Sequence, residues 1–189
     1  MNKLNRTFIS VIAVMIIVVN LTGCGYSAGK VKNGVYTNDY FGFSVTPPEW
    51  IDCVENPQDA DDWVIALSYC YIQGEKDSFI AEYALQKPSA GLMVVSEDNP
   101  GGVTADRFVE NIQSQQSEKI FFTYNTIVNK DVYINGVSFR QLTFDSDGNH
   151  QTFLIKILDD RILFIYISTT KHAVEAGEED ALIESVSSV

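Results

Sequence analysis

Oxygen-bearing side chains gather in one short stretch of this sequence, DSDGN. Asp145, Asp147 and Asn149 offer carboxylate and amide oxygens at alternate positions, and these are ligands that calcium prefers. An EF-hand loop has glycine at its sixth position and glutamate at its twelfth, whereas here Gly148 is fourth and Lys156 is twelfth. Because aspartate, glycine and asparagine also favour tight turns, we expect a hairpin turn, with a weak calcium site as the alternative.

The residue groups that catalysis requires are not evident in the sequence. No G-x-S-x-G pattern marks a serine nucleophile, and His150, in an expected strand, is predicted to be a surface or sheet-edge residue. Glu178, Glu179 and Asp180 could supply an acid pair for glycoside cleavage, but they begin an expected helix, where carboxylates complement the helix dipole. We favour the dipole interpretation and expect no catalytic residue, no cofactor and no enzyme activity.

Two cysteines leave a structural question open. Cys53 and Cys70 could form a disulfide in an exported protein, if their Cα atoms approach within about 7 Å, or they could be two buried thiols. No C-x-x-C spacing points to a redox or metal site. Trp63, Tyr69 and Tyr71 lie in the same region and could line a ligand surface, although aromatic side chains are more often in the core.

The third cysteine, Cys24, follows an apolar run over residues 8–19, which is preceded by Lys3 and Arg6 and by no acid. A membrane-spanning helix needs about 20 apolar residues, so this run is too short. A basic start, an apolar core of about 7–15 residues and a small-residue end are typical of an export signal. We therefore predict that residues 1–23 are a signal peptide.

The residues before that cysteine, Leu21-Thr22-Gly23-Cys24, resemble the bacterial lipobox. The resemblance implies a diacylglycerol in thioether linkage to Cys24 and cleavage between Gly23 and Cys24. Two acyl chains anchor a protein stably, whereas one chain binds only marginally at about 0.8 kcal/mol per buried CH₂. The expected location is the extracytoplasmic face of the cell membrane, with the membrane as a partner through the lipid. The alternative is a free cysteine beside an uncleaved anchor helix.

Charge and composition narrow the class of partner. The net charge of −12 argues against nucleic acid and against electrostatic docking on anionic lipid. Residues 24–38 are small, polar and glycine-rich, and we predict a lipidated cysteine followed by a flexible tether. The rest, 39–189, is expected to be a single domain.

The sequence predicts a series of strands and two helices, and these elements must position the residues described above. The fold class we predict is α+β, a central antiparallel β-sheet flanked by helices. Thr104 can cap the first helix, Asn135-Gly136 marks a hairpin turn, and Trp50 is an expected core anchor. The segment 59–72 is ambiguous between helix and strand. Strands are predicted over 40–46, 79–85, 91–96, 120–128, 131–134, 137–144, 150–158 and 161–168, and helices over 104–116 and 174–187.

The stretch YFGFSVTPPEW, residues 40–50, resembles the opening of PsbP-like domains, in which an aromatic-Gly-aromatic strand leads to proline and tryptophan. The segment 101–116, the Asn135-Gly136 turn and the closing residues 181–186 are similar to the same family, although the usual glycine before Trp50 is missing. The resemblance covers roughly residues 36–187 and implies an α/β/α sandwich. It implies protein binding more than catalysis, since members include an extrinsic subunit of photosystem II and many bacterial lipoproteins. No functional residue carries over.

These observations together predict a lipid-anchored, extracytoplasmic PsbP-like lipoprotein that acts as a non-catalytic binding or adaptor module of the cell envelope, with an envelope protein as partner. The alternative is a surface sensor for a small ligand or cation, which the acidic charge and aspartate-rich turns motivate.

Overall fold

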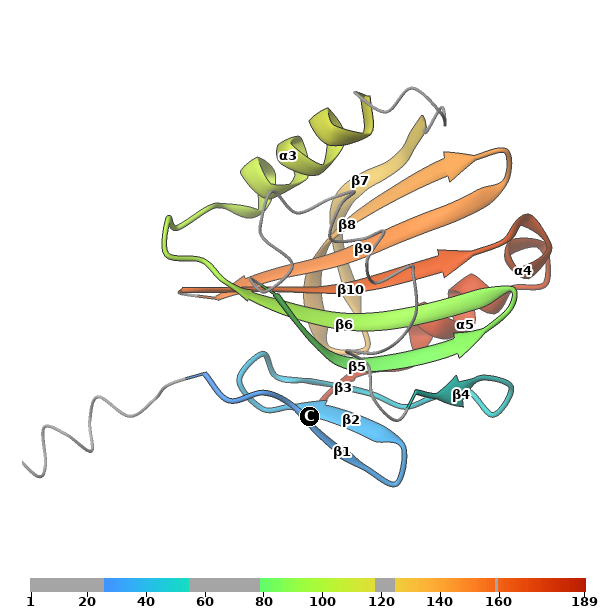
Figure 1. Cartoon of the computed structure of the whole chain (residues 1–189), viewed down its shortest axis with the longest axis horizontal. Helices are drawn as coiled ribbons and strands as arrows, with labels where there is room; N and C mark the ends of the chain where they lie inside the picture. The colour runs from blue at the N-terminus through green and yellow to red at the C-terminus, as the bar shows by residue number, and fades with distance from the viewer. Residues whose placement is uncertain (1–25, 55–78, 118–124, 159) are drawn as a thin grey trace, which may run out of the picture.

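The computed structural model describes residues 26–54, 79–117, 125–158 and 160–189, which form two antiparallel sheets (Figure 1). The smaller sheet has the order β1-β2-β3-β11 and the larger one β4-β5-β6-β10-β9-β8-β7. The strands are β1 Lys30–Lys32, β2 Val35–Asn38, β3 Phe43–Val45, β4 Asp52–Cys53, β5 Phe79–Lys87, β6 Ala90–Asp98, β7 Asn125–Ile134, β8 Val137–Ser146, β9 Asn149–Leu158, β10 Arg161–Thr169 and β11 Val186–Ser188. The helices are α3 Ala105–Ser117, α4 Lys171–Glu175 and α5 Glu178–Glu184.

Two-residue turns join several of these strands. Asn135 and Gly136 connect β7 to β8 with φ of 42° and 94°, which is the left-handed geometry that twisted hairpins require. Asp147 and Gly148 connect β8 to β9 in the same conformation, with φ of 54° and 81°. Both stretches were predicted to be turns, and both predictions are confirmed.

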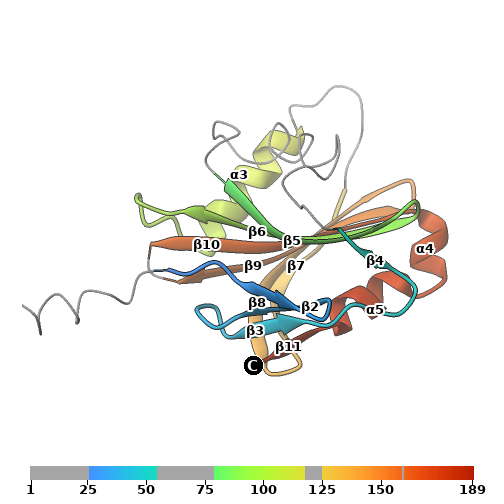
Figure 2. The ribbon, with the colours of Figure 1, turned by 60° about the horizontal axis from the view of Figure 1, so that its bottom comes forward.

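The large sheet separates two hydrophobic cores. Leu163, Ile165 and Ile167 of β10 point toward the small sheet, where they pack in one cluster with Tyr36 and Phe43. The intervening side chains of β10 face the opposite side, where α3 covers the sheet (Figure 2). Strand β10 is therefore buried on both faces, which explains its nearly continuous apolar sequence.

The predicted fold class is wrong, because a second β-sheet, and not helices alone, covers one face of the central sheet. The described chain is mostly β, with α3 on the other face and the short helices α4 and α5 near the ends of β9 and β10 (Figures 1 and 2). The α+β sandwich was inferred from two long helices, and only α3 matches that expectation. Thr104 accepts a hydrogen bond from the backbone N–H of Arg107, so the predicted cap of α3 is confirmed.

Two segments account for the difference. Residues 30–38, predicted as part of a flexible tether, form the β1–β2 hairpin across Asn33-Gly34, and Tyr36 is fully buried. The predicted helix over 174–187 is interrupted at Gly177, whose φ of 76° ends α4 and begins α5. The last residues of that segment form β11, which pairs with β3 and completes the small sheet.

Some of the other secondary-structure predictions are confirmed, and others are wrong in their bounds or burial. The strands near 79–85, 91–96, 137–144, 150–158 and 161–168 are confirmed. The predicted strand over 40–46 shortens to β3, and β7 continues through 128–131, where two separate strands were expected. Trp50 was expected in the core but is 38% exposed, with the Lys87 ammonium 4.3 Å from its ring centroid. The segment 59–72 lies outside the described residues.

Candidate functional site

The first described residue, Tyr26, is docked at the end of the large sheet where β10 begins. The Arg161 guanidinium lies 3.9 Å from the centroid of the Tyr26 ring, a cation–π contact. The Tyr26 hydroxyl is 2.9 Å from Ser96 Oγ, and its ring meets the ring of Tyr40 edge-on at 5.4 Å. Tyr26 is therefore held by a cation, a hydroxyl and an aromatic ring from three separate segments.

Arg161 is the charged centre of this contact. The residue is only 8% exposed, it pairs with Asp98, and it donates to Ser96 Oγ at 3.2 Å. Glu97 lies nearby, and burial raises its pKa to about 7, although the positive charge of Arg161 opposes the rise. Because a buried guanidinium is costly unless it is paired, the contacts with Tyr26 and Asp98 offset part of the cost of burying Arg161.

A second contact fixes the same N-terminal segment at Gly29, three residues after Tyr26. The backbone N–H of Gly29 donates to Glu82 Oε2 at 2.7 Å, and the Tyr36 hydroxyl donates to the same oxygen at 2.5 Å. Burial raises the pKa of Glu82 and also that of Tyr36. A Cβ at Gly29 would lie 2.2 Å from the Tyr36 ring, so this close approach requires glycine. We call Tyr26, Gly29, Glu82, Ser96 and Arg161 the N-terminal docking site.

The predicted lipidation and cleavage residues, Gly23 and Cys24, lie outside the described residues, immediately before this site. An extended chain spans at most about 3.6 Å per residue. Cys24 is two residues from Tyr26, so its Cα lies within about 7 Å of the Cα of Tyr26. Among the described residues, no helix has the length and apolarity to cross a membrane.

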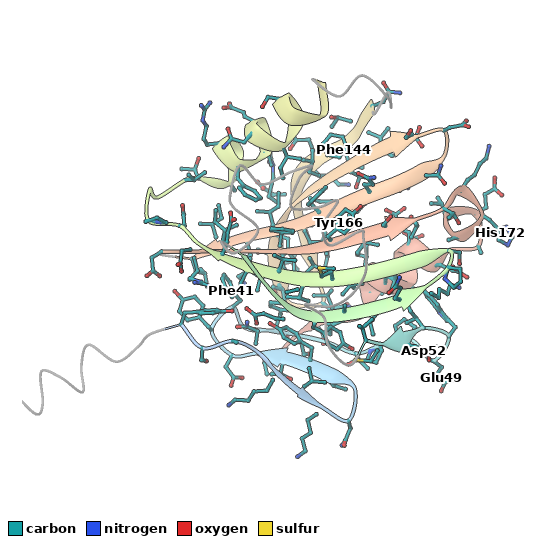
Figure 3. All side chains as sticks on the ribbon, in the orientation of Figure 1. Phe41, Glu49, Asp52, Phe144, Tyr166 and His172 are labelled. Atoms are coloured by element: carbon teal, nitrogen blue, oxygen red, sulfur yellow. The ribbon has the colours of Figure 1, made fainter. Side chains whose placement is uncertain are left out.

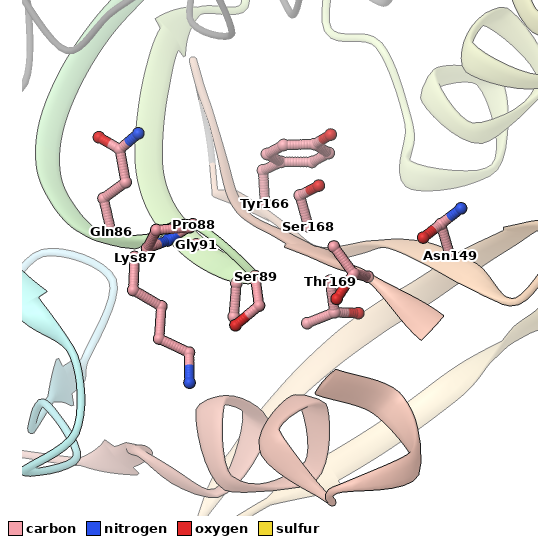
Figure 4. Close-up of a pocket in the computed structure, with 11 residues that line it drawn as sticks. Gln86, Lys87, Pro88, Ser89, Gly91, Asn149, Tyr166, Ser168 and Thr169 are labelled. Carbon is pink, nitrogen blue, oxygen red and sulfur yellow. The ribbon is translucent and has the colours of Figure 1, made fainter. Parts of the chain in front are cut away.

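The opposite end of the large sheet carries a pocket of about 310 Å³ (Figure 4). Lys87 and Ser89 of the β5–β6 hairpin, Asn149 of β9 and Ser168 of β10 contribute polar groups to its lining. The Lys87 ammonium is 2.6 Å from a carboxylate oxygen of Glu178 in α5. The lining side chains in Figure 4 thus bear hydroxyl, amide and ammonium groups that suit a small polar ligand.

A buried polar cluster joins α5 to the sheet near that end. His150 Nδ1 lies 2.5 Å from Glu179 Oε2, and Thr152 donates to Glu179 Oε1 at 2.7 Å. Glu178, Glu179 and Asp180 do occupy the first turn of α5, as predicted, but Glu179 is buried and bonded to the sheet. Of the two expectations for His150, the sheet-edge position is wrong, since β9 lies between β10 and β8, and the side chain is part-buried, with 18% of it exposed.

Two of the three residues of the weak calcium prediction, Asp145 and Asn149, accept backbone hydrogen bonds. Asp145 Oδ1 accepts from the Gly148 backbone N–H at 2.9 Å, and Asn149 Oδ1 accepts from the Lys171 backbone N–H at 3.0 Å. Asp147 is exposed at the turn. Within the described part of the chain, no three His, Cys, Asp or Glu side chains are grouped to hold a metal ion.

The remaining predicted residues are only partly described. Cys53, at the end of β4, is exposed, so the alternative of a buried thiol is wrong at this position. Cys70, Trp63, Tyr69 and Tyr71 lie outside the described residues, so the disulfide and the aromatic ligand surface stay predictions. Figure 3 places Asp52, beside Cys53, at the edge of the molecule near Glu49.

Sequence reasoning missed the N-terminal docking site. Its five residues are spread over four segments, and only the fold brings them together. One signal was present: Arg161 begins a strand that is otherwise almost wholly apolar, which indicates a buried cation that needs partners.

The two antiparallel sheets, with α3 on the outer face of the larger one, define a PsbP-like fold. The solution structure of cyanobacterial PsbP (CyanoP) from Synechocystis sp. PCC 6803 matches with a TM-score of 0.50 at 12% identity, covering 88% of this chain and 96% of that chain. At this identity the likeness shows the fold alone. No protein-family model matches the sequence, and no curated protein matches it.

Proposed function

We propose that this protein is a lipid-anchored, extracytoplasmic binding or adaptor module of the cell envelope. The observation that carries the anchor is the position of Tyr26, which packs on Arg161 only two residues after Cys24 of the lipobox-like sequence. Cleavage between Gly23 and Cys24 would leave every described element in the mature chain. The lipid would then be attached directly at the edge of a folded domain.

Two observations, one at His150 and one at the pocket, support a proposal without catalysis. His150 is engaged with Glu179, and its other ring nitrogen is 3.6 Å from Asp145. As far as the structure describes the pocket, its lining includes no histidine or cysteine that could activate a hydroxyl. A binding role fits this chemistry better than hydrolysis.

A small-ligand sensor is the second candidate, and the pocket is the observation that favours it. Its hydroxyls, the Asn149 amide and the Lys87 ammonium could bind a small polar or anionic molecule. A ligand that binds only the folded state would raise the melting temperature. A thermal-shift screen of small polar compounds, with Lys87→Ala and Ser168→Ala variants as controls, tests this candidate.

The experiment that tests the anchor is mass spectrometry of the N-terminal peptide from a bacterial host. We expect Cys24 at the mature N-terminus with a thioether-linked diacylglycerol, and the protein in the membrane fraction. A Cys24→Ala variant should lack the lipid. An unmodified Cys24 within an uncleaved chain would overturn the proposed anchor.

The adaptor part needs a separate measurement. Crosslinking of the tagged, lipidated protein in intact cells should capture one envelope protein reproducibly, and the Cys24→Ala variant should lose it. Capture of the same abundant proteins by both forms would contradict a membrane-positioned adaptor.

A further inference from the structure

The N-terminal docking site has a geometric consequence that rests on the proposed lipid anchor. From Tyr26 onward the chain is fixed to the domain, first by Arg161 and Ser96, then by the bond from Gly29 to Glu82. The β1–β2 hairpin follows at once. Only Gly25 separates the lipid-bearing residue from this docked segment.

We infer that the domain has no long tether and is held directly at the bilayer surface, with the Arg161 end of the large sheet facing the lipid headgroups and the pocket end directed away. The chain between Cys24 and Tyr26 spans at most about 7 Å, so the lipid cannot move far from the Arg161 end. The surface that meets the bilayer is formed by the docked Tyr26, by Asp39 and Tyr40 beside it, and by Asp160 before β10.

The pocket lies at the other end of the same strands. Strand β10 runs from Arg161, which contacts Tyr26, to Thr169, which lines the pocket. Its nine residues rise about 3.3 Å each, so these ends are about 26 Å apart. Lys87 of the pocket also contacts the Trp50 ring, which places Trp50 at the distal end.

Charge at the membrane-facing end is consistent with anchoring by lipid and not by electrostatics. Asp39, Asp98 and Asp160 are exposed there, whereas Arg161 is buried and paired. Anionic headgroups would repel these carboxylates. The short link to the lipid, and not a basic patch, therefore determines how close this end lies to the membrane.

The inference can be tested on vesicles with the mature chain, residues 24–189, carrying Cys53→Ser and Cys70→Ser. Cys24 is then coupled to a maleimide lipid in phosphatidylcholine vesicles that contain a dansyl headgroup lipid as an energy acceptor. With Trp63→Phe, the native Trp50 reports on the pocket end. With Asp160→Trp and both native tryptophans changed to phenylalanine, the reporter lies at the exposed β9–β10 turn.

We expect several-fold stronger energy transfer from the tryptophan at position 160 than from Trp50. A ten-residue Gly-Ser linker inserted between Gly25 and Tyr26 adds a root-mean-square reach of about 17 Å and should remove most of this difference. Tyr26→Ala should reduce the difference, whereas Tyr26→Phe, which retains the ring over Arg161, should preserve it. Equal transfer from the two positions, or a difference that the linker leaves unchanged, would overturn the inference.

This test is independent of acylation in cells, because the lipid is attached chemically. If Cys24 carries no lipid in the bacterial host but the vesicle result holds, the proposed anchor fails and the docking geometry stands. If Cys24 is lipidated but the two reporters transfer equally, the anchor stands and the fixed orientation fails.

Discussion

His150 Nδ1 of β9 and Glu179 Oε2 of α5 lie 2.5 Å apart, and this contact fastens the C-terminal helix to the large sheet. The other carboxylate oxygen of Glu179 accepts from Thr152, whose hydroxyl is 2.8 Å from that of Thr143. This single buried carboxylate thus bonds two polar side chains of β9, and Thr152 extends the network to Thr143 on β8. Removing it would leave the part-buried His150 ring and the buried Thr152 hydroxyl without this hydrogen-bond partner.

We therefore predict that Glu179→Ala lowers the free energy of unfolding by about 1–3 kcal/mol, the cost of buried polar groups left unsatisfied. Asp180→Ala is the matched control, because Asp180 occupies the same helical turn but is exposed. It should cost no more than about 0.5 kcal/mol. Urea unfolding of the two variants measures the difference, and equal losses would mean that Glu179 acts only through the helix dipole.

Tyr26→Ala should destabilise the domain by about 2 kcal/mol, because it removes the ring over Arg161 and the hydroxyl that meets Ser96. Tyr26→Phe keeps the ring and should cost about half as much. Chemical denaturation of the mature chain separates the two contributions. If Tyr26→Ala is as stable as the parent, the N-terminal segment is not docked in solution.

Gly29→Ala should be strongly destabilising for its size, by about 2 kcal/mol or more, because the added Cβ would overlap the Tyr36 ring. The backbone bond from Gly29 to Glu82 would be lost as the segment shifts. Gly101→Ala is a suitable control, since a Cβ there meets no atom within 4 Å. Melting temperatures of both variants provide the measurement, and similar values for the two would argue against the close approach.

Stability should fall as the pH rises from about 4.5 to about 7, because burial raises the pKa of Glu97 in the folded state to about 7 from an ordinary value of 4.5. In that range the folded state holds more protons than the unfolded state, so deprotonation favours unfolding. Glu97→Gln should reduce this dependence, to which the raised pKa of Glu82 also contributes, and should stabilise the domain near pH 8 by on the order of 1–2 kcal/mol. Urea unfolding across this pH range measures the slope. Glu110→Gln, in an exposed part of α3, should leave it unchanged.

Millimolar calcium should leave the melting temperature unchanged, because Asp145 and Asn149 already accept backbone hydrogen bonds in the turn and at α4. Magnesium at equal concentration controls for ionic strength. A rise specific to calcium, lost in Asp147→Asn, would instead support the cation-sensor alternative.

Local signals predicted much of this fold. The Asn135-Gly136 turn, the Thr104 cap and the strands on either side of each turn could be read from the sequence, because each depends on a few adjacent residues. The same signal was present at Asn33-Gly34, where φ is 53° and 79°, but the small, polar and glycine-rich composition favoured a tether. The hairpin is stable because Tyr36 stacks on Tyr83, which is remote in sequence.

The candidate sites depend on such remote contacts to a greater degree. The acids of α5 were correctly placed at a helix start, yet only the fold shows that Glu179 faces His150 and Thr152. Trp50 was expected in the core by residue type, but the position of Lys87 provides a cation–π partner near the surface. Contacts between residues 29 or more positions apart, such as His150 and Glu179, produce no periodic pattern in a single sequence, so they could not be predicted from it.

Strand β11 has a consequence for how the chain acquires its structure. Residues 186–188 pair with residues 43–45, so the small sheet is closed by two segments that are 143 residues apart, as Ser44 and Ser187 show. Pairing across such a separation has a high loop-closure cost and slows folding. The hydrophobic face of the large sheet that the small sheet covers cannot be fully buried until β11 has paired with β3. A partly synthesised chain that lacks β11 therefore leaves this face incompletely covered, and the domain can complete its folding only after residues 186–188 have paired with β3.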